Sequence, residues 1–119
     1  MLRIHAIGNH SKYHCGSRAA WNVISAETAR HGQMVSAKDE FDLLIVNGEG
    51  SMHHDSGGFR KKMEQIERAL DQGRRVMLIN TVWQDNPQRD ADVLKRCERV
   101  VVREAVSYTH LTLPTICSV

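Results

Sequence analysis

The strongest constraint on the fold is a short apolar run that leads into a polar, glycine-containing turn. Residues 43–47 read Leu-Leu-Ile-Val-Asn, and residues 48–54 read Gly-Glu-Gly-Ser-Met-His-His. Branched apolar residues without polar alternation are typical of a strand that is buried on both faces of a parallel sheet. In an open α/β sheet, ligands bind at the carboxyl ends of the strands. The sequence therefore predicts a functional site in the turn after residue 47.

Strands and helices are predicted to alternate along the whole chain. The expected strands are 2–7, 34–36, 43–47, 76–80 and 100–102, and the expected helices are 18–31, 59–73 and 89–98. Ser17 is expected to cap the first helix, and Lys62 to lie on the solvent side of the second. This alternation predicts an α/β fold, a Rossmann-like parallel sheet flanked by helices. The loops after Ile7, Asn47 and Asn80 would then share one edge.

The turn at residues 48–54 supplies acid, hydroxyl and imidazole groups. Gly48 and Gly50 are expected to adopt backbone angles that other residues avoid and to let a ligand approach the main chain. Glu49 can accept hydrogen bonds from sugar hydroxyls or act as a general base. A structural alternative stays open, in which Glu49 only bonds to nearby amides. The third glycine of a dinucleotide site is absent, and the chain has no phosphate-binding loop motif.

Ser51 and two histidines complete the turn. Adjacent histidines rarely bind the same ion, and His53 and His54 lack the usual His-x-x-x-His spacing, so no metal site is predicted. One histidine is expected to face the cleft as an acid, base or hydrogen-bond donor, while the other braces the turn. Ser51 adds a hydroxyl to the same surface.

Trp83 and Cys15 each allow two interpretations. Trp83 lies just past a predicted strand end, where it could stack on a sugar or close the core. Cys15 follows His14 and could be a nucleophile. Because no partner for Cys15 is evident in the sequence, it is expected to be a small buried residue instead.

Composition argues against several classes of partner. The 119 residues carry 16 basic and 14 acidic side chains that are mixed along the chain, so neither nucleic acid nor a membrane surface is indicated. No apolar run approaches the roughly 18 residues of a membrane span, and the first residues are too polar for a signal peptide. The three cysteines form no CxxC pair, which argues against a disulfide framework. A cytoplasmic protein is expected.

Three segments taken together resemble the polysaccharide pyruvyl transferase family. They are Gly8-Asn9 with Cys15-Gly16-Ser17, then residues 44–54, then Ile79-Asn80-Thr81-Val82-Trp83. The resemblance spans nearly all of residues 1–104 and is most specific in the middle segment. It implies the N-terminal lobe of a two-lobed enzyme similar to the GT-B glycosyltransferases.

Members of that family transfer the enolpyruvyl group of phosphoenolpyruvate to two hydroxyls of a sugar in a surface glycan, without a cofactor. The expected catalytic residues are Glu49 and His53, and the expected substrate-binding residues are Asn9, Gly48, Gly50, Ser51, His54 and Trp83. The acceptor would be a glycan or a lipid-linked sugar, and a second lobe would bind phosphoenolpyruvate. The chain alone is therefore expected to be inactive. The rival interpretation is a non-catalytic glycan-binding lobe or half of a GT-B glycosyltransferase.

The last fifteen residues differ in character from the rest. Residues 105–119 carry no charged side chain, whereas the 16 basic and 14 acidic residues all lie in 1–104. Residues 106–115, Val-Ser-Tyr-Thr-His-Leu-Thr-Leu-Pro-Thr, resemble the conceptual translation of a transposon adapter used to build sequencing libraries. The native lobe is therefore expected to end near Glu104, followed by a non-native tail that is frayed or docked nonspecifically. An ordinary uncharged strand is the alternative.

Overall fold

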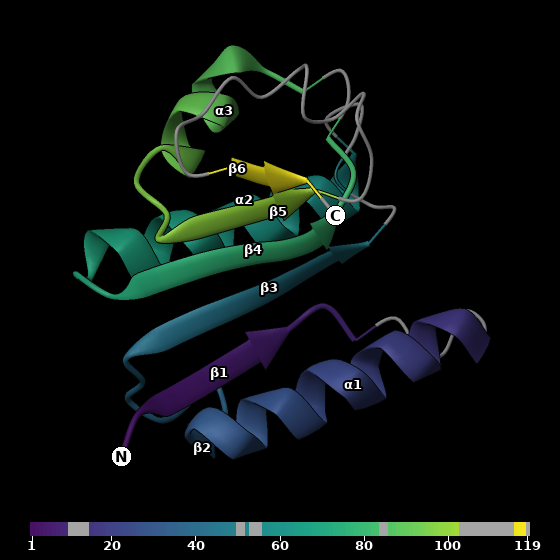
Figure 1. Cartoon of the computed structure of the whole chain (residues 1–119). Coiled ribbons are helices and arrows are strands. Elements are labelled where there is room, and N and C mark those ends of the chain that lie inside the picture. Colours follow the sequence, from purple (N-terminus) through teal and green to yellow (C-terminus); the bar gives the residue numbers. More distant parts are fainter. Residues whose placement is uncertain (10–14, 50–51, 53–55, 84–85, 103–115, 119) are drawn as a thin grey trace.

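A computed structural model of the chain describes residues 1–9, 15–49, 52, 56–83, 86–102 and 116–118. These residues form one parallel sheet with three helices (Figure 1). The strands are β1 (Arg3–Ile7), β2 (Gln33–Met34), β3 (Leu43–Glu49), β4 (Arg75–Thr81), β5 (Arg99–Val102) and β6 (Ile116–Ser118), and the helices are α1 (Cys15–His31), α2 (Gly57–Asp71) and α3 (Gln88–Leu94). The prediction of a Rossmann-like parallel α/β sheet is confirmed.

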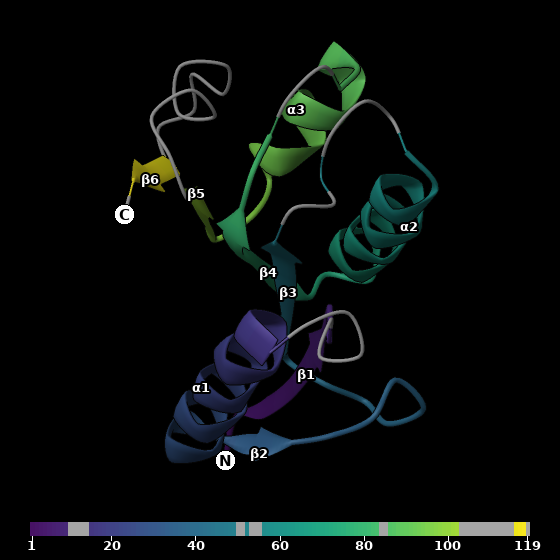
Figure 2. The same cartoon turned by 90° about the vertical axis from the view of Figure 1, so that its right-hand side faces the viewer.

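The strand order is β2-β1-β3-β4-β5-β6, and every neighbouring pair is parallel. The chain moves outwards in one direction from β1 to β2 and in the other direction from β3 to β5. Because right-handed crossovers then place their helices on opposite sides, α1 covers one face of the sheet while α2 and α3 cover the other (Figure 2). The carboxyl ends of β1, β3 and β4 lie at one edge, as predicted.

The apolar core lies between the sheet and α2 and α3. Phe59, Met63 and Ile66 of α2 are fully buried against alternate residues of the strands. The strand residues of this core are Leu44, Val46, Val76, Leu78, Val100 and Val102. Full burial of one such side chain stabilises the fold by about 1.5–3 kcal/mol. This packing fixes the position of α2 relative to β3 and β4.

The other face of the sheet is covered less completely. An apolar groove of about 380 Å³ lies between α1 and the strands, and Ile45, Met77 and Ile79 line it while staying partly exposed. In the described part of the chain, no helix is long and apolar enough to cross a membrane.

The starts of α1 and α2 differ from the sequence prediction, and α3 ends at Leu94, four residues before its expected end. Helix α1 begins at Cys15, so Ser17 lies inside its first turn and is not the cap. Helix α2 begins at Gly57, two residues before its expected start. The Ser56 hydroxyl accepts a hydrogen bond from the Phe59 amide at 3.3 Å, which satisfies one of the unpaired amides of the first turn.

The C-terminal tail contributes the edge strand β6. Its residues Ile116–Ser118 pair in parallel with β5, and Val101 is the partner of Cys117. These three residues are therefore docked against the sheet and are not frayed. Residues 103–115 and 119 lie outside the described residues, and the non-native origin of the tail stays a prediction.

Candidate functional site

Polar side chains are buried where β3 and β4 end. Asn47 is fully buried and Glu49 is 8% exposed, although apolar residues precede them in β3. Asn47 is the sheet partner of Ile79, and Glu49 is the partner of Thr81. Burying polar groups is costly unless they are hydrogen-bonded, so their partners decide what this edge can do.

Asn47 links the ends of three strands. Its side-chain Nδ2 donates to the Gly8 carbonyl at 3.0 Å, and its Oδ1 accepts from Nδ2 of Asn80 at 3.0 Å. The Asn47 Nδ2 also lies 3.4 Å from Oε1 of Glu49. Asn47 therefore fixes β1, β3 and β4 relative to one another at the edge where ligands bind in such sheets.

Donors from two different elements bond to the Glu49 carboxylate. Ser17 of α1 donates its hydroxyl to Oε2 at 2.9 Å, and Asn47 reaches Oε1 from the same strand. The expected cap residue Ser17 is thus a partner of Glu49, because the earlier start of α1 turns its side chain towards the sheet edge. These contacts fix the plane of the carboxylate.

Lys62 places an amine beside the end of β3. It is 8% exposed, and its Nζ donates to the Gly48 carbonyl at 3.5 Å. Burial lowers the pKa of Lys62 to about 8, and the charge of Glu49 partly opposes that shift. The prediction of a solvent-facing Lys62 is wrong. Its position three residues after Phe59 and four before Ile66 places it on the buried side of α2, and that spacing was visible in the sequence.

The five side chains of Ser17, Asn47, Glu49, Lys62 and Asn80 are called the polar cluster below. Its backbone is unusual at two positions. Glu49 has φ of 42° and Asn80 has φ of 50°, in the left-handed region that most side chains avoid. Such a conformation costs on the order of 1–3 kcal/mol for a non-glycine residue and is concentrated at functional sites. The pairing of β4 with β5 is also irregular between Leu78 and Thr81.

Two glycines are needed for packing at this edge. Gly8 has φ of 95°, and a Cβ there would lie 2.2 Å from the Asn47 carbonyl oxygen. A Cβ on Gly48 would lie 2.3 Å from the Thr81 hydroxyl oxygen. Gly48 has no positive φ, so the expected special backbone angle at this residue is wrong. Its missing side chain makes room for Thr81, and a substrate-binding role for Gly48 stays a prediction.

The other predicted site residues fall into three groups. Asn9 is exposed at the end of β1, close in sequence to Gly8 of the polar edge. Trp83 is only 2% exposed and packs edge-on against Phe59 with ring centroids 5.3 Å apart, which favours the core-closing interpretation over sugar stacking. The remaining residues, Gly50, Ser51, His53 and His54, lie outside the described residues.

Cys15 is exposed at the first position of α1, so the expectation of a buried residue is wrong. The early helix start explains this, because it places Cys15 at the helix end and not in a packed turn. Cys97 is the buried cysteine, and burial raises its pKa to about 12. Within the described ranges, no group of three or more His, Cys, Asp or Glu side chains could hold a metal ion.

Comparisons of the chain with protein-family models, with curated proteins and with solved structures found no match. The functional case therefore depends on the geometry of the polar cluster. A carboxylate held at a strand end, with an amine below it, can accept hydrogen bonds from hydroxyl groups and can receive a proton from one of them.

Proposed function

We propose that this chain is the acceptor-binding lobe of a pyruvyl transferase similar to the polysaccharide pyruvyl transferases. The observation that supports it best is the Glu49 carboxylate. Ser17 and Asn47 hold it at the carboxyl edge of a parallel sheet, on a strained backbone. A buried charge and local strain both reduce stability, and such features persist where a site needs a fixed chemical group.

The reaction requires groups of this kind on the acceptor side. Two sugar hydroxyls each bond to the central carbon of the enolpyruvyl group, its bond to the phosphate oxygen breaks, and inorganic phosphate leaves. One hydroxyl proton ends on the methylene carbon, which becomes a methyl group, and the other ends on phosphate or solvent. In this proposal Glu49 receives a hydroxyl proton as the general base. The ammonium form of Lys62 balances the buried negative charge of Glu49.

The donor side of the reaction is assigned to a second lobe. Phosphoenolpyruvate is highly anionic and needs several cations to hold it, whereas the polar cluster has one amine, which lies below the main chain at Gly48. The carboxylate of Glu49 would also repel a phosphate placed beside it. The polar cluster therefore suits the neutral sugar.

A transfer assay tests the proposal. The enzyme is this lobe joined to a donor-binding lobe, and the readout is phosphate release with formation of a pyruvate ketal on a glycan acceptor. Glu49→Gln should lower kcat by about two to four orders of magnitude, because it removes the general base while keeping the shape. Lys61→Gln changes an exposed neighbour of Lys62 and should leave the rate unchanged.

A fall of less than about threefold in Glu49→Gln would return Glu49 to a structural role. The 119-residue chain alone should not turn over phosphoenolpyruvate, since rate depends on holding both reactants together. Sugar binding without any transfer would favour the rival interpretation of a glycan-binding lobe.

A further inference from the structure

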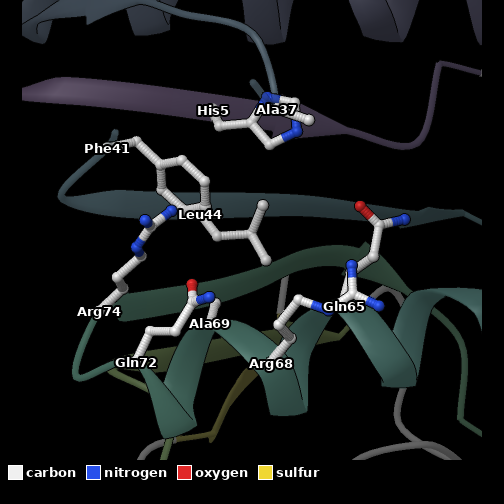
Figure 3. A pocket seen from close by; sticks show the side chains of 9 residues that line it. All are labelled: His5, Ala37, Phe41, Leu44, Gln65, Arg68, Ala69, Gln72 and Arg74. Carbon is white, nitrogen blue, oxygen red and sulfur yellow. The ribbon is translucent and has the colours of Figure 1, made fainter. Parts of the chain in front are cut away.

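A half-open pocket of about 140 Å³ lies at the opposite end of β3 from the polar cluster (Figure 3). Its lining includes His5 of β1, Phe41 before β3, Leu44 of β3, and Gln65, Arg68 and Arg74 in and after α2. It is called the arginine pocket below. Arg68 lies in the last turn of α2 and Arg74 directly precedes β4, and both border this cavity.

The arginines of this pocket differ from four others in how they are paired. In the described part of the chain, other arginines bond to carboxylates across elements: Arg60 to Asp90, Arg75 to Glu98, Arg89 to Glu67 and Arg96 to Asp71. Arg68 and Arg74 have no carboxylate within 4.0 Å among the described residues. Glu64 lies one turn before Arg68 on α2 and does not pair with it. Two positive charges therefore face the same cavity, and no described residue pairs an anion with either of them.

The floor of the pocket includes the apolar Leu44, and one of its cations stacks on an aromatic ring. Leu44 is buried beneath the cavity, and the guanidinium carbon of Arg74 lies 3.9 Å from the centre of the Phe41 ring. A guanidinium that stacks on a ring face still presents the N–H groups in its plane, and these can donate to a carboxylate. The His5 ring lies 5.3 Å from the Phe41 ring, and its Nδ1 lies 3.2 Å from the Val35 carbonyl oxygen, which supports this wall.

The two cations occupy different sides of the cavity. Figure 3 shows Arg74 beside Phe41 at one side and Arg68 beside Gln65 at the other, with Leu44 between them. A ligand that satisfies both needs an anionic group at each end and a short apolar middle. The size agrees, because an engineered cavity of about 150 Å³ in another protein is large enough for benzene.

We propose that the arginine pocket binds a short dicarboxylate. One carboxylate lies against the guanidinium of Arg74, the other against that of Arg68, and the hydrocarbon middle rests on Leu44. Arg74 is the stronger contact because it is partly buried and stacked, whereas Arg68 is exposed and more screened by water. This site is separate from the polar cluster and does not depend on the function proposed above.

An amide NMR titration of the full 119-residue chain at low ionic strength tests this site. The probes are glutarate, butyrate and glutaramide, which share a similar carbon chain but carry two, one and no negative charges. Glutarate should bind in the millimolar range, shift the amides of Leu44 and Ala69, and bind several-fold more tightly than butyrate. Equal shifts from glutarate and glutaramide, or no binding of glutarate, would overturn the proposal.

Three variants locate the charges. Arg74→Gln should weaken glutarate binding about tenfold, and Arg68→Gln about threefold. Lys61→Gln, which removes one positive charge from the same helix at an exposed position, should change binding by less than twofold. A loss in Lys61→Gln as large as in Arg74→Gln would show attraction to net charge alone and contradict the site. If Arg74→Gln fails to fold, the comparison of glutarate, butyrate and glutaramide in the unmodified chain still tests whether the pocket binds a dicarboxylate.

Discussion

The apolar core and the polar cluster are buried by the same strands only a few residues apart. Leu44 and Val46 of β3 join the core, whereas Asn47 and Glu49 of the same strand form the polar edge. The core gains free energy from every residue it removes from water. The polar cluster buries a carboxylate and an amine. Removing these two groups from water costs free energy, and their mutual attraction offsets only part of that cost.

The apolar core therefore stabilises the fold, whereas the polar cluster does not. Apolar residues of similar size are often at least as stabilising as a buried charged pair. The left-handed backbone at Glu49 adds strain to the same edge, whereas Asn80 adopts that conformation at lower cost. A cluster that lowers stability in two ways is understood most simply as a site. The predictions below test whether the two regions differ in this way.

The largest expected effect is in the core. Phe59→Ala removes a fully buried ring that packs against Trp83, so it should lower the free energy of unfolding by about 3–5 kcal/mol. Denaturant unfolding followed by tryptophan fluorescence measures this loss. Ala29, which is exposed on α1, offers a control, because Ala29→Ser should cost less than about 0.5 kcal/mol. A loss below about 1 kcal/mol in Phe59→Ala would contradict the assigned core.

The next effect is the pH dependence that Lys62 produces. Its pKa is about 8 in the folded chain, against 10.5 for an ordinary lysine. Between these values the unfolded chain binds more protons, so stability should rise with pH by up to about 3 kcal/mol from this residue. Lys62→Met should remove that rise. The measurement is the difference in unfolding free energy between the two proteins at pH 7.5, 9 and 10.5.

Cys97 acts in the opposite direction over part of this range. Its folded pKa is raised to about 12 from 9.0, so the unfolded thiol ionises first and stability falls as pH rises through that interval. Both proteins contain Cys97, and the difference between them cancels its contribution. Parallel pH curves for the two proteins would show that Lys62 is not held in a buried environment.

Sequence patterns predicted the fold better than they predicted the partners of Glu49. The apolar runs ending at Asn47 and Asn80 fixed the two central strands, because period and composition are local properties. Ser17 and Lys62 were assigned elsewhere, since α1 begins two residues before the clearest cap signal and a lysine is ordinarily solvated. The sequence suggested that Gly48 leaves room for a ligand. Its close contact with Thr81 could not be found from the sequence, because it arises only when β3 and β4 pair.

The smallest expected effect is at the C-terminal tail. Deleting residues 105–119 removes the three-residue edge strand β6 and leaves the core and the polar cluster intact. The free energy of unfolding should change by less than about 0.5 kcal/mol, as for changes away from the core. Chemical denaturation of the two lengths side by side measures it. A loss of several kcal/mol would show that the tail belongs to the folded lobe.

The most direct test of the polar cluster is sugar binding by the chain itself. Amide NMR titrations with a panel of methyl glycosides should move the signals of Asn9, Gly48, Glu49 and Asn80 and leave those of the core in place. Glu49→Gln should keep the folded spectrum and weaken binding about tenfold, since it replaces a charged acceptor by a neutral one. No response at this edge to any glycoside, or equal binding by Glu49→Gln, would contradict the assignment of the polar cluster as the acceptor site.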